Sequence, residues 1–181
     1  MRYINKIKEE QKEEAAKFVG KVFLDSEDEE ASNLVMNLIK EIRSKKYYVP
    51  ELEIVMSDEK NNIIGYCMFS RFHIEGKYDN ELLLLSPVAV KTELQRQHIS
   101  KEIIEYGFNK AIELGFKVCI VEGNPLNYRS RGFVTSKDYN INASESVGLP
   151  APECLMVKEL VKGSLEKMSG YINYEMYDSL R

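Results

Sequence analysis

Residues 81–104 read ELLLLSPVAVKTELQRQHISKEII, and this stretch decides the fold. Its first ten residues are apolar almost throughout, which is typical of a central strand buried on both faces. Pro87 lies inside that run and has no N–H to donate, so the predicted strand is bulged or unpaired there. From Ile99 to about Leu114, apolar residues recur at helical spacing. The sequence therefore predicts a strand that turns directly into a helix, a common place to bind phosphate.

The strand and the loop after it could hold two parts of one ligand. Backbone groups beside Pro87 that lack a strand partner could pair with an extended amide. N–H groups at 96–101 would meet a diphosphate at the helix start, where the helix dipole also favours an anion. Pantetheine amides followed by a pyrophosphate describe coenzyme A. Loops with this task usually contain glycine, and this loop has none.

The rest of the chain alternates between helical and strand patterns, with no internal repeat or linker, so one α/β or α+β domain over residues 1–181 is expected. Asn124 and Pro125 predict the start of a short helix, with Asn124 as N-cap. A polar loop without secondary structure is expected at 136–152. Further helices are expected at 9–23 and 25–46, and strands at 1–8, on both sides of a turn at 58–62, at 116–123, after Gly132–Phe133, and as a closing pair at 153–161 and 169–177.

Composition narrows the functional classes. The chain has 181 residues, 44% of them hydrophobic, with a net charge of −4 and a pI near 5.4, which argues against a nucleic-acid partner. No apolar run approaches the roughly 18 residues of a membrane span, and the N-terminus lacks the apolar core of a signal peptide. Cys67, Cys119 and Cys154, with His73 and His98, show no metal-ligand spacing. We expect reduced thiols, no metal and a cytoplasmic protein.

Residues 87–104 resemble motif A of the GNAT superfamily of acyl-CoA-dependent N-acetyltransferases, which runs from an apolar strand through Gln/Arg-x-x-Gly-x-Gly/Ala into a helix. His98 stands in place of the first glycine and Ser100 in place of Gly or Ala. Residues 121–133, VEGNPLNYRSRGF, are similar to the family's second segment, with Tyr128 four residues before a Gly-Phe pair. With the tail 152–177, the likeness covers nearly the whole chain and is similar to the bacterial branch often labelled predicted N-acetyltransferase.

The resemblance implies a V-shaped mixed sheet flanked by helices, with acetyl-CoA as cosubstrate between the fourth and fifth strands. Strand main-chain groups would pair with pantetheine, and the loop amides would hold the pyrophosphate. Tyr128 would be the general acid that protonates the departing CoA thiolate after direct amine attack. The implied cosubstrate contacts are Val88, Ala89, Val90, Gln95, Arg96, Gln97, His98, Ile99, Ser100, Lys101 and Asn124.

The expected function is transfer of an acetyl group to a primary amine of a small molecule or protein. The alternative is a GNAT-fold protein whose glycine-free loop leaves a non-catalytic binding or regulatory module. Transfer to a tRNA or a hydroxyl has no sequence support. The acceptor is unknown, because the first helices, the loop 135–152 and the last strands that set it follow no common motif. The oligomeric state stays open, a homodimer included.

Several individual residues can be interpreted either as part of the functional site or as ordinary structural or surface residues. Tyr128 could act on CoA or only pack its ring. His98 could offer an imidazolium to the pyrophosphate or be a surface residue without a role. Glu81 and Glu122, near predicted strand ends, could deprotonate an amine or simply be solvated. Cys119 lies mid-strand, which favours a buried thiol over a nucleophile.

Overall fold

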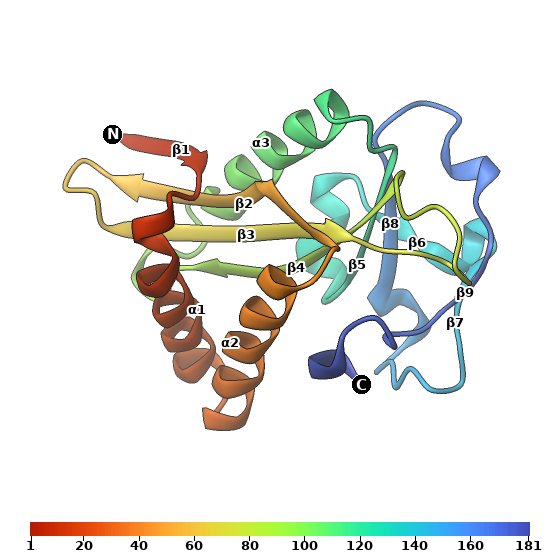
Figure 1. The fold of residues 1–181 in the computed structure, drawn as a ribbon, viewed down its shortest axis with the longest axis horizontal. Coiled ribbons are helices and arrows are strands. Elements are labelled where there is room, and N and C mark those ends of the chain that lie inside the picture. Colours follow the sequence, from red (N-terminus) through yellow and green to blue (C-terminus); the bar gives the residue numbers. More distant parts are fainter. The chain divides into compact units, whose positions relative to one another are not determined.

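A computed structural model describes residues 1–181, and the predicted order of helices and strands is largely confirmed (Figure 1). The helices are Lys12–Ser26 (α1), Glu29–Ser44 (α2), Ile99–Glu113 (α3) and Pro125–Tyr128 (α4). The strands are Arg2–Lys6 (β1), Tyr48–Asp58 (β2), Ile63–Arg71 (β3), Leu82–Val90 (β4), Val118–Glu122 (β5), Val134–Thr135 (β6), Ile141–Ala143 (β7), Leu155–Glu159 (β8) and Gly170–Ile172 (β9).

Seven strands form one mixed sheet in the order β1-β2-β3-β4-β5-β8-β6. β4 and β5 run parallel, whereas β1–β2, β2–β3, β5–β8 and β6–β8 are antiparallel. β7 and β9 form a separate parallel pair. The predicted mixed α/β class, with helices flanking the sheet, is therefore confirmed.

Two predictions about the C-terminal third are wrong. The segment 136–152 is not without structure, because it contains β7. β8 and β9 do not pair with each other, since β8 lies between β5 and β6 while β9 pairs with β7. Ile141 of β7 and Ile172 of β9 are fully buried, so this pairing hides two apolar side chains that the surrounding polar sequence obscures.

The chain divides into two compact units, which we describe separately. The N-terminal unit comprises Met1–Ser70 and Ser86–Lys110, and the C-terminal unit comprises Arg71–Leu85 and Ala111–Arg181. β4 contributes its first residues to the C-terminal unit and its last residues to the N-terminal unit. The prediction of one domain over the whole chain stays a prediction.

In the N-terminal unit, β3 presents alternate side chains to two helical layers. The thiol of Cys67 lies 3.8 Å from the carbonyl oxygen of Ile103 in α3. Phe69 packs edge-on against Phe108 of α3, with ring centroids 5.8 Å apart. Its ring fills the space that a side chain at Gly107 would need. Because neighbouring strand residues point to opposite faces, the other face of the hairpin is left for α1 and α2, which lie together (Figure 1).

That second face contains a buried ionic cluster around Glu53. Glu53 is fully buried, and Arg43 of α2 donates to it from Nε at 3.0 Å and from a terminal nitrogen at 2.5 Å. The hydroxyls of Tyr48 and Tyr66 donate to the same carboxylate at 2.5 and 2.8 Å. Burial, followed by the Glu53 charge, raises the pKa of Tyr66 well above its ordinary value. The cluster joins α2 to the hairpin and satisfies a charge that would otherwise be costly to bury.

Candidate functional site

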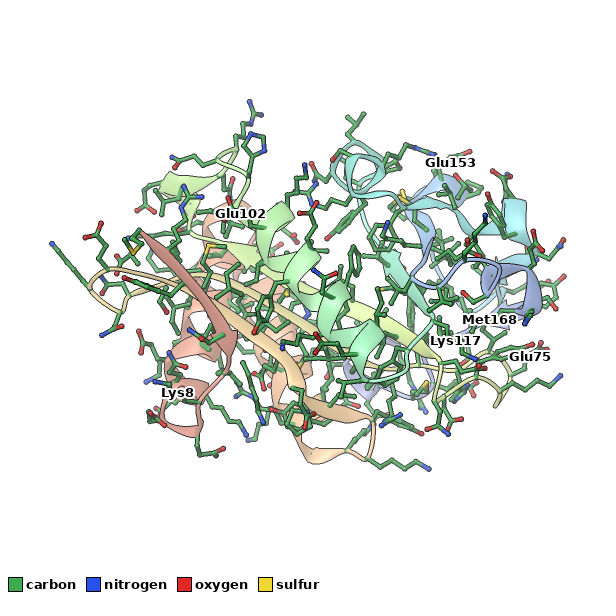
Figure 2. All side chains as sticks on the ribbon, turned by 90° about the horizontal axis from the view of Figure 1, so that it is seen from above. Lys8, Glu75, Glu102, Lys117, Glu153 and Met168 are labelled. Carbon is green, nitrogen blue, oxygen red and sulfur yellow. The ribbon has the colours of Figure 1, made fainter.

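The predicted phosphate loop follows β4, whose last residues extend beyond its pairing with β5. The parallel register between β4 and β5 runs from Leu82 to Leu84 and ends before Pro87, as the sequence predicts. The chain then passes through a short turn at Thr92–Leu94 and enters α3. The first intrahelical bond joins the N–H of Glu102, labelled in Figure 2, to the carbonyl oxygen of His98 at 3.0 Å. The N–H groups of the first turn of a helix point out along the helix axis, and this is the arrangement that binds an anion.

Two loop residues have the backbone conformation of glycine. Arg96 has φ 63° and His98 has φ 64°, both in the left-handed region. A side chain there crowds the following carbonyl and costs about 1–2 kcal/mol per residue. His98 occupies the position where the resemblance expects the motif's first glycine, and its backbone has a conformation that glycine adopts without strain. Strain of this kind persists where surrounding contacts hold it, and it gathers at functional sites.

Contacts from α1, β3 and β1 hold the loop. The hydroxyl of Thr92 donates to Asp25 at 3.2 Å, and the N–H of Lys91 donates to the carbonyl oxygen of Ile64 at 2.9 Å. On the far side of the turn, Arg2 donates to the backbone carbonyl and to the side-chain oxygen of Gln97, both at 3.2 Å. These contacts all lie within the N-terminal unit.

The residues predicted to contact CoA differ in what they can offer. Ile99 is buried, and its side chain packs against Gly65, so only its backbone is available to a ligand. Lys101 is exposed and lies 3.9 Å from Glu105. Ala89 is buried in the strand. The side chains of Gln95, Arg96, Gln97 and His98 are exposed, whereas those of Val88, Val90 and Ser100 are half-buried.

The second predicted segment, in the C-terminal unit, surrounds Tyr128. Asn124 accepts a hydrogen bond from the N–H of Leu126 at 3.0 Å, and Pro125 is the first residue of α4, which confirms the predicted helix start. The N–H of Gly123 donates to the carbonyl oxygen of Cys154 at 2.9 Å and ties the turn to the start of β8. A β-carbon on Gly123 would lie 2.5 Å from Cε2 of Tyr128. The missing side chain is therefore what lets the tyrosine ring lie against the backbone.

The spacing between Tyr128 and the Gly132–Phe133 pair has a physical reason. Gly132 has φ 88° and ends the turn of 3₁₀-helix that follows α4. This reversal brings the N–H of Phe133 to the carbonyl oxygen of Tyr128 at 3.3 Å. The two rings then meet edge-on, with centroids 5.7 Å apart and planes at 83°. Tyr128 is half-buried and fixed on both sides.

The two candidate carboxylates already have partners. Glu81 forms an ion pair at 2.6 Å with Lys117, which Figure 2 labels. Glu122, at the end of β5, accepts a hydrogen bond at 2.8 Å from the hydroxyl of Tyr174. Tyr174 is stacked on Phe72, with ring centroids 6.0 Å apart. Burial, followed by the Glu122 charge, raises the pKa of Tyr174, so its phenol stays a donor to Glu122.

A cavity of about 270 Å³ opens in the C-terminal unit beside the same end of β5 and β8. Leu155, one of its lining residues, is the register partner of Glu122, and Gly123 bonds the residue before it. The lining contains one cation and no carboxylate. It comprises Ser136, Lys137, Asn142, Ala143, Val147, Leu149, Pro152 and Leu155.

The remaining predictions concern cysteines, metals and membranes. Cys67 and Cys119 are buried and Cys154 is half-buried, and none is in a disulfide. Burial raises the pKa of the Cys67 thiol well above its ordinary value. No three His, Cys, Asp or Glu side chains gather in a way that could hold a metal ion. None of the helices combines the length and the hydropathy needed to cross a bilayer.

Sequence reasoning missed several residues of these two segments. Arg2 and Asp25 lie 95 and 67 residues from their partners in the loop. Tyr174 lies 52 residues from Glu122. Local patterns carry no signal for such contacts, because each depends on how distant strands and helices pack. Gly123 had a weaker signal, the Gly-Asn-Pro turn after a buried strand.

Comparison with known proteins supports one fold. No family model matches the chain. The uncharacterized N-acetyltransferase YhbS of Escherichia coli is 23% identical over 124 residues, 68% of this chain and 71% of that protein. The crystal structure of E. coli YhbS in complex with CoA has a TM-score of 0.81 at 20% identity, over 96% of this chain and 89% of that one. A GNAT acetyltransferase of Brucella melitensis, in complex with acetyl-CoA, has a TM-score of 0.66 at 21% identity, over 74% and 82%.

Proposed function

We propose that this chain, which is similar in fold and sequence to GNAT N-acetyltransferases, belongs to that superfamily and transfers an acetyl group from acetyl-CoA to a primary amine of a small molecule or protein. The observation that carries this proposal is the loop between β4 and α3. It has a left-handed turn that leads directly into the start of α3, which fits the predicted acyl-CoA loop although no glycine is present. Backbone strain of this kind costs energy and gathers at functional sites, which supports a role for this loop.

In this proposal acetyl-CoA is bound mainly by backbone groups. Main-chain groups of Val88, Ala89 and Val90 pair with the pantetheine amides, as an added strand would. The first N–H groups of α3 take the pyrophosphate, helped by the positive end of the helix dipole. The pyrophosphate would reach these N–H groups past the backbone of Ile99, the hydroxyl of Ser100 and a set of polar side chains around the turn. These side chains are Gln95, Arg96, Gln97, His98 and Lys101.

Tyr128 is the proposed general acid. The neutral amine attacks the thioester carbonyl carbon and forms the C–N bond, and the C–S bond then breaks as the tetrahedral intermediate collapses. The Tyr128 hydroxyl gives its proton to the departing CoA sulfur, the amine's surplus proton passes to solvent, and solvent returns a proton to the Tyr128 phenolate. Gly123 and Phe133 hold the ring, so the hydroxyl is positioned before substrate binds. Asn124 shapes the turn that presents this helix.

The cavity beside β5 and β8 is the proposed entry for the acceptor. Its single cation, Lys137, and absence of carboxylates favour an amine whose remaining groups are neutral or anionic. Ala143→Leu would narrow the cavity. It should raise the KM for the amine and leave the KM for acetyl-CoA unchanged. An equal change in both KM values would show that the acceptor does not enter through this cavity.

Cosubstrate binding is tested by thermal unfolding with and without acetyl-CoA. A ligand at 100 times its dissociation constant stabilises the folded state by about 2.7 kcal/mol, which is roughly 5–11 °C for a chain of this size. CoA and acetyl-CoA should both raise the midpoint, and adenosine alone should raise it less. No shift at millimolar acetyl-CoA would contradict the proposal.

The acid role is tested by Tyr128→Phe. With an amine that is acetylated, we expect kcat to fall about 100-fold, within the range for a lost general acid, while CoA binding is kept. Tyr171→Phe, on an exposed tyrosine of the same unit, is the matched control and should change neither constant. An unchanged kcat in Tyr128→Phe would remove this residue from the acid role.

A binding or regulatory module remains the second candidate, and the glycine-free loop is the observation that favours it. That function predicts a small or absent thermal shift with CoA and no loss of the thioester with any amine tested. The cytoplasmic location and the homodimer stay predictions. Gel filtration coupled to light scattering measures the assembly directly.

A further inference from the structure

Arg2, on the edge strand β1, holds the residue between the two strained positions of the loop. One terminal nitrogen donates to the backbone carbonyl of Gln97 and the other to its side-chain oxygen, both at 3.2 Å. The first nitrogen also lies 3.6 Å from a carboxylate oxygen of Glu102 in α3. One guanidinium therefore joins the middle of the loop to the first turn of the helix.

The two neighbours of Gln97 are the residues whose backbones are left-handed, Arg96 and His98. Glycine would reach this conformation without cost, but these side chains disfavour it. A contact that fixes the intervening carbonyl restricts the rotations on both sides of it. The planar fork of arginine suits this task, because its two donors are held at a fixed separation.

We propose that Arg2 is a positioning residue for the phosphate loop and supports the left-handed turn that a glycine at position 98 would adopt without strain. The inference rests on the proposed function, because the loop is taken to bind the pyrophosphate of CoA. Arg2 acts through Gln97 and Glu102, and its contacts direct the guanidinium to the protein rather than to the ligand.

The strand that carries Arg2 is itself anchored. Arg2 is the register partner of Asp58, at the end of β2. Asp58 caps the hairpin turn, accepting from the N–H groups of Lys60 and Asn62 at 2.8 and 2.9 Å. The α-amino group of Met1 lies 2.9 Å from Glu59 in the same turn. The guanidinium is thus supported by a fixed backbone and not by a loose end.

The main test measures CoA binding by calorimetry in Arg2→Ala and Arg2→Lys. We expect the dissociation constant to rise about tenfold in Arg2→Ala, the size of a lost hydrogen-bonded charge, and nearly as much in Arg2→Lys, which has no fork. Lys6→Ala, on the same face of the same strand, is the matched control and should stay within about twofold of the parent chain. Unchanged affinity in Arg2→Ala would overturn the proposal.

Glycine rescue distinguishes loop positioning from a general loss of stability. His98→Gly in the Arg2→Ala background should recover about threefold or more of the lost affinity, because glycine adopts the turn without support. The proposal would also be overturned if Arg2→Ala cost as much affinity in the His98→Gly background as it does in the parent chain.

Hydrogen exchange separates the failure of this inference from the failure of the proposed function. Without any ligand, the amides at 95–101 should exchange faster in Arg2→Ala than in the parent chain. In Lys6→Ala their exchange rates should not change. If the chain binds no CoA but exchange responds in this way, the function is wrong and the positioning role stands. If CoA binds and the exchange rates at 95–101 do not change in Arg2→Ala, the positioning role of Arg2 is wrong.

Discussion

The loop at 95–98 and the segment at 123–133 differ in whether glycine occupies the positions that restrict the backbone. The first contains no glycine, and His98 stands where the resemblance expects one, yet its backbone is left-handed at Arg96 and His98. The second keeps Gly123 and Gly132. The difference is in what surrounds each position. Side chains at 96 and 98 extend into solvent, whereas the space at Gly123 is occupied by the ring of Tyr128.

A glycine that supplies only conformation can be replaced if other contacts hold the backbone. The cost is the energy of the turn, about 1–2 kcal/mol per residue, and a neighbouring contact such as that of Arg2 can offset it. A glycine that supplies space cannot be replaced in this way, because the side chain would need the volume of a packed ring. The comparison therefore predicts different outcomes for substitutions in the two segments.

The largest effect is expected for Gly123→Ala. The new β-carbon would lie 2.5 Å from Cε2 of Tyr128, and Phe133 restricts where the ring can go. A displacement near 1 Å at a reacting group can cost about 100-fold, so we expect kcat to fall by between about 10-fold and 100-fold. Steady-state kinetics at saturating acetyl-CoA measures it.

The double variant shows whether this loss acts through the hydroxyl. In a Tyr128→Phe background the acid is already absent, so Gly123→Ala should cost little more. Losses that multiply would mean that Gly123 matters for another reason, such as the bond from its N–H to Cys154.

Local patterns were enough to predict the frame of both segments. Each of three features depends on residues that are close together in the sequence: the apolar run before Pro87, the helix from Ile99 and the Asn124–Pro125 cap. Their consequences follow from short-range sterics and hydrogen bonding, which is why the strand, loop and helix lie where the sequence places them.

The parts that sequence reasoning did not reach depend on distant contacts. Glu53 sits in an alternating strand pattern and looks like a solvated carboxylate, yet Arg43 and two tyrosines bury it. The left-handed backbone at His98 contradicts the preference of the residue itself, because the fold around it decides the conformation. Arg2 could not be connected to Gln97 without the pairing of β1 with the hairpin.

The second prediction uses Gly132, which supplies conformation at φ 88°. A β-carbon there would also touch the end of Lys158, a flexible side chain that can move. Gly132→Ala should therefore lower the free energy of unfolding by about 1–2 kcal/mol, the cost of the left-handed turn. Urea denaturation measures this change.

Gly163→Ala is the matched control for the second prediction. Gly163 has φ 85° with no atom within 4 Å of the missing β-carbon, so it reports the backbone cost alone. The two substitutions should agree within about 0.5 kcal/mol. A much larger loss of unfolding free energy in Gly132→Ala would mean that its neighbours are as rigid as those of Gly123. Gly132 would then, like Gly123, be needed for the space it leaves.

The smallest effect, with the opposite sign, is expected for His98→Gly. Removing the side chain releases the strain of the left-handed turn, while the freer unfolded chain takes back part of that gain. The net result should be a stabilisation of about 0.5 kcal/mol, or roughly 1–2 °C in the unfolding midpoint. His98→Ala removes the same imidazole but keeps a β-carbon in the turn, so the strain stays and this variant should not stabilise the fold. The pair also reports on CoA: weaker binding in both variants would assign a contact to the imidazole, whereas tighter binding in His98→Gly alone would assign the cost to the backbone. If glycine at this position destabilised the fold, the turn would not be strained, and the contrast between the two segments would fail.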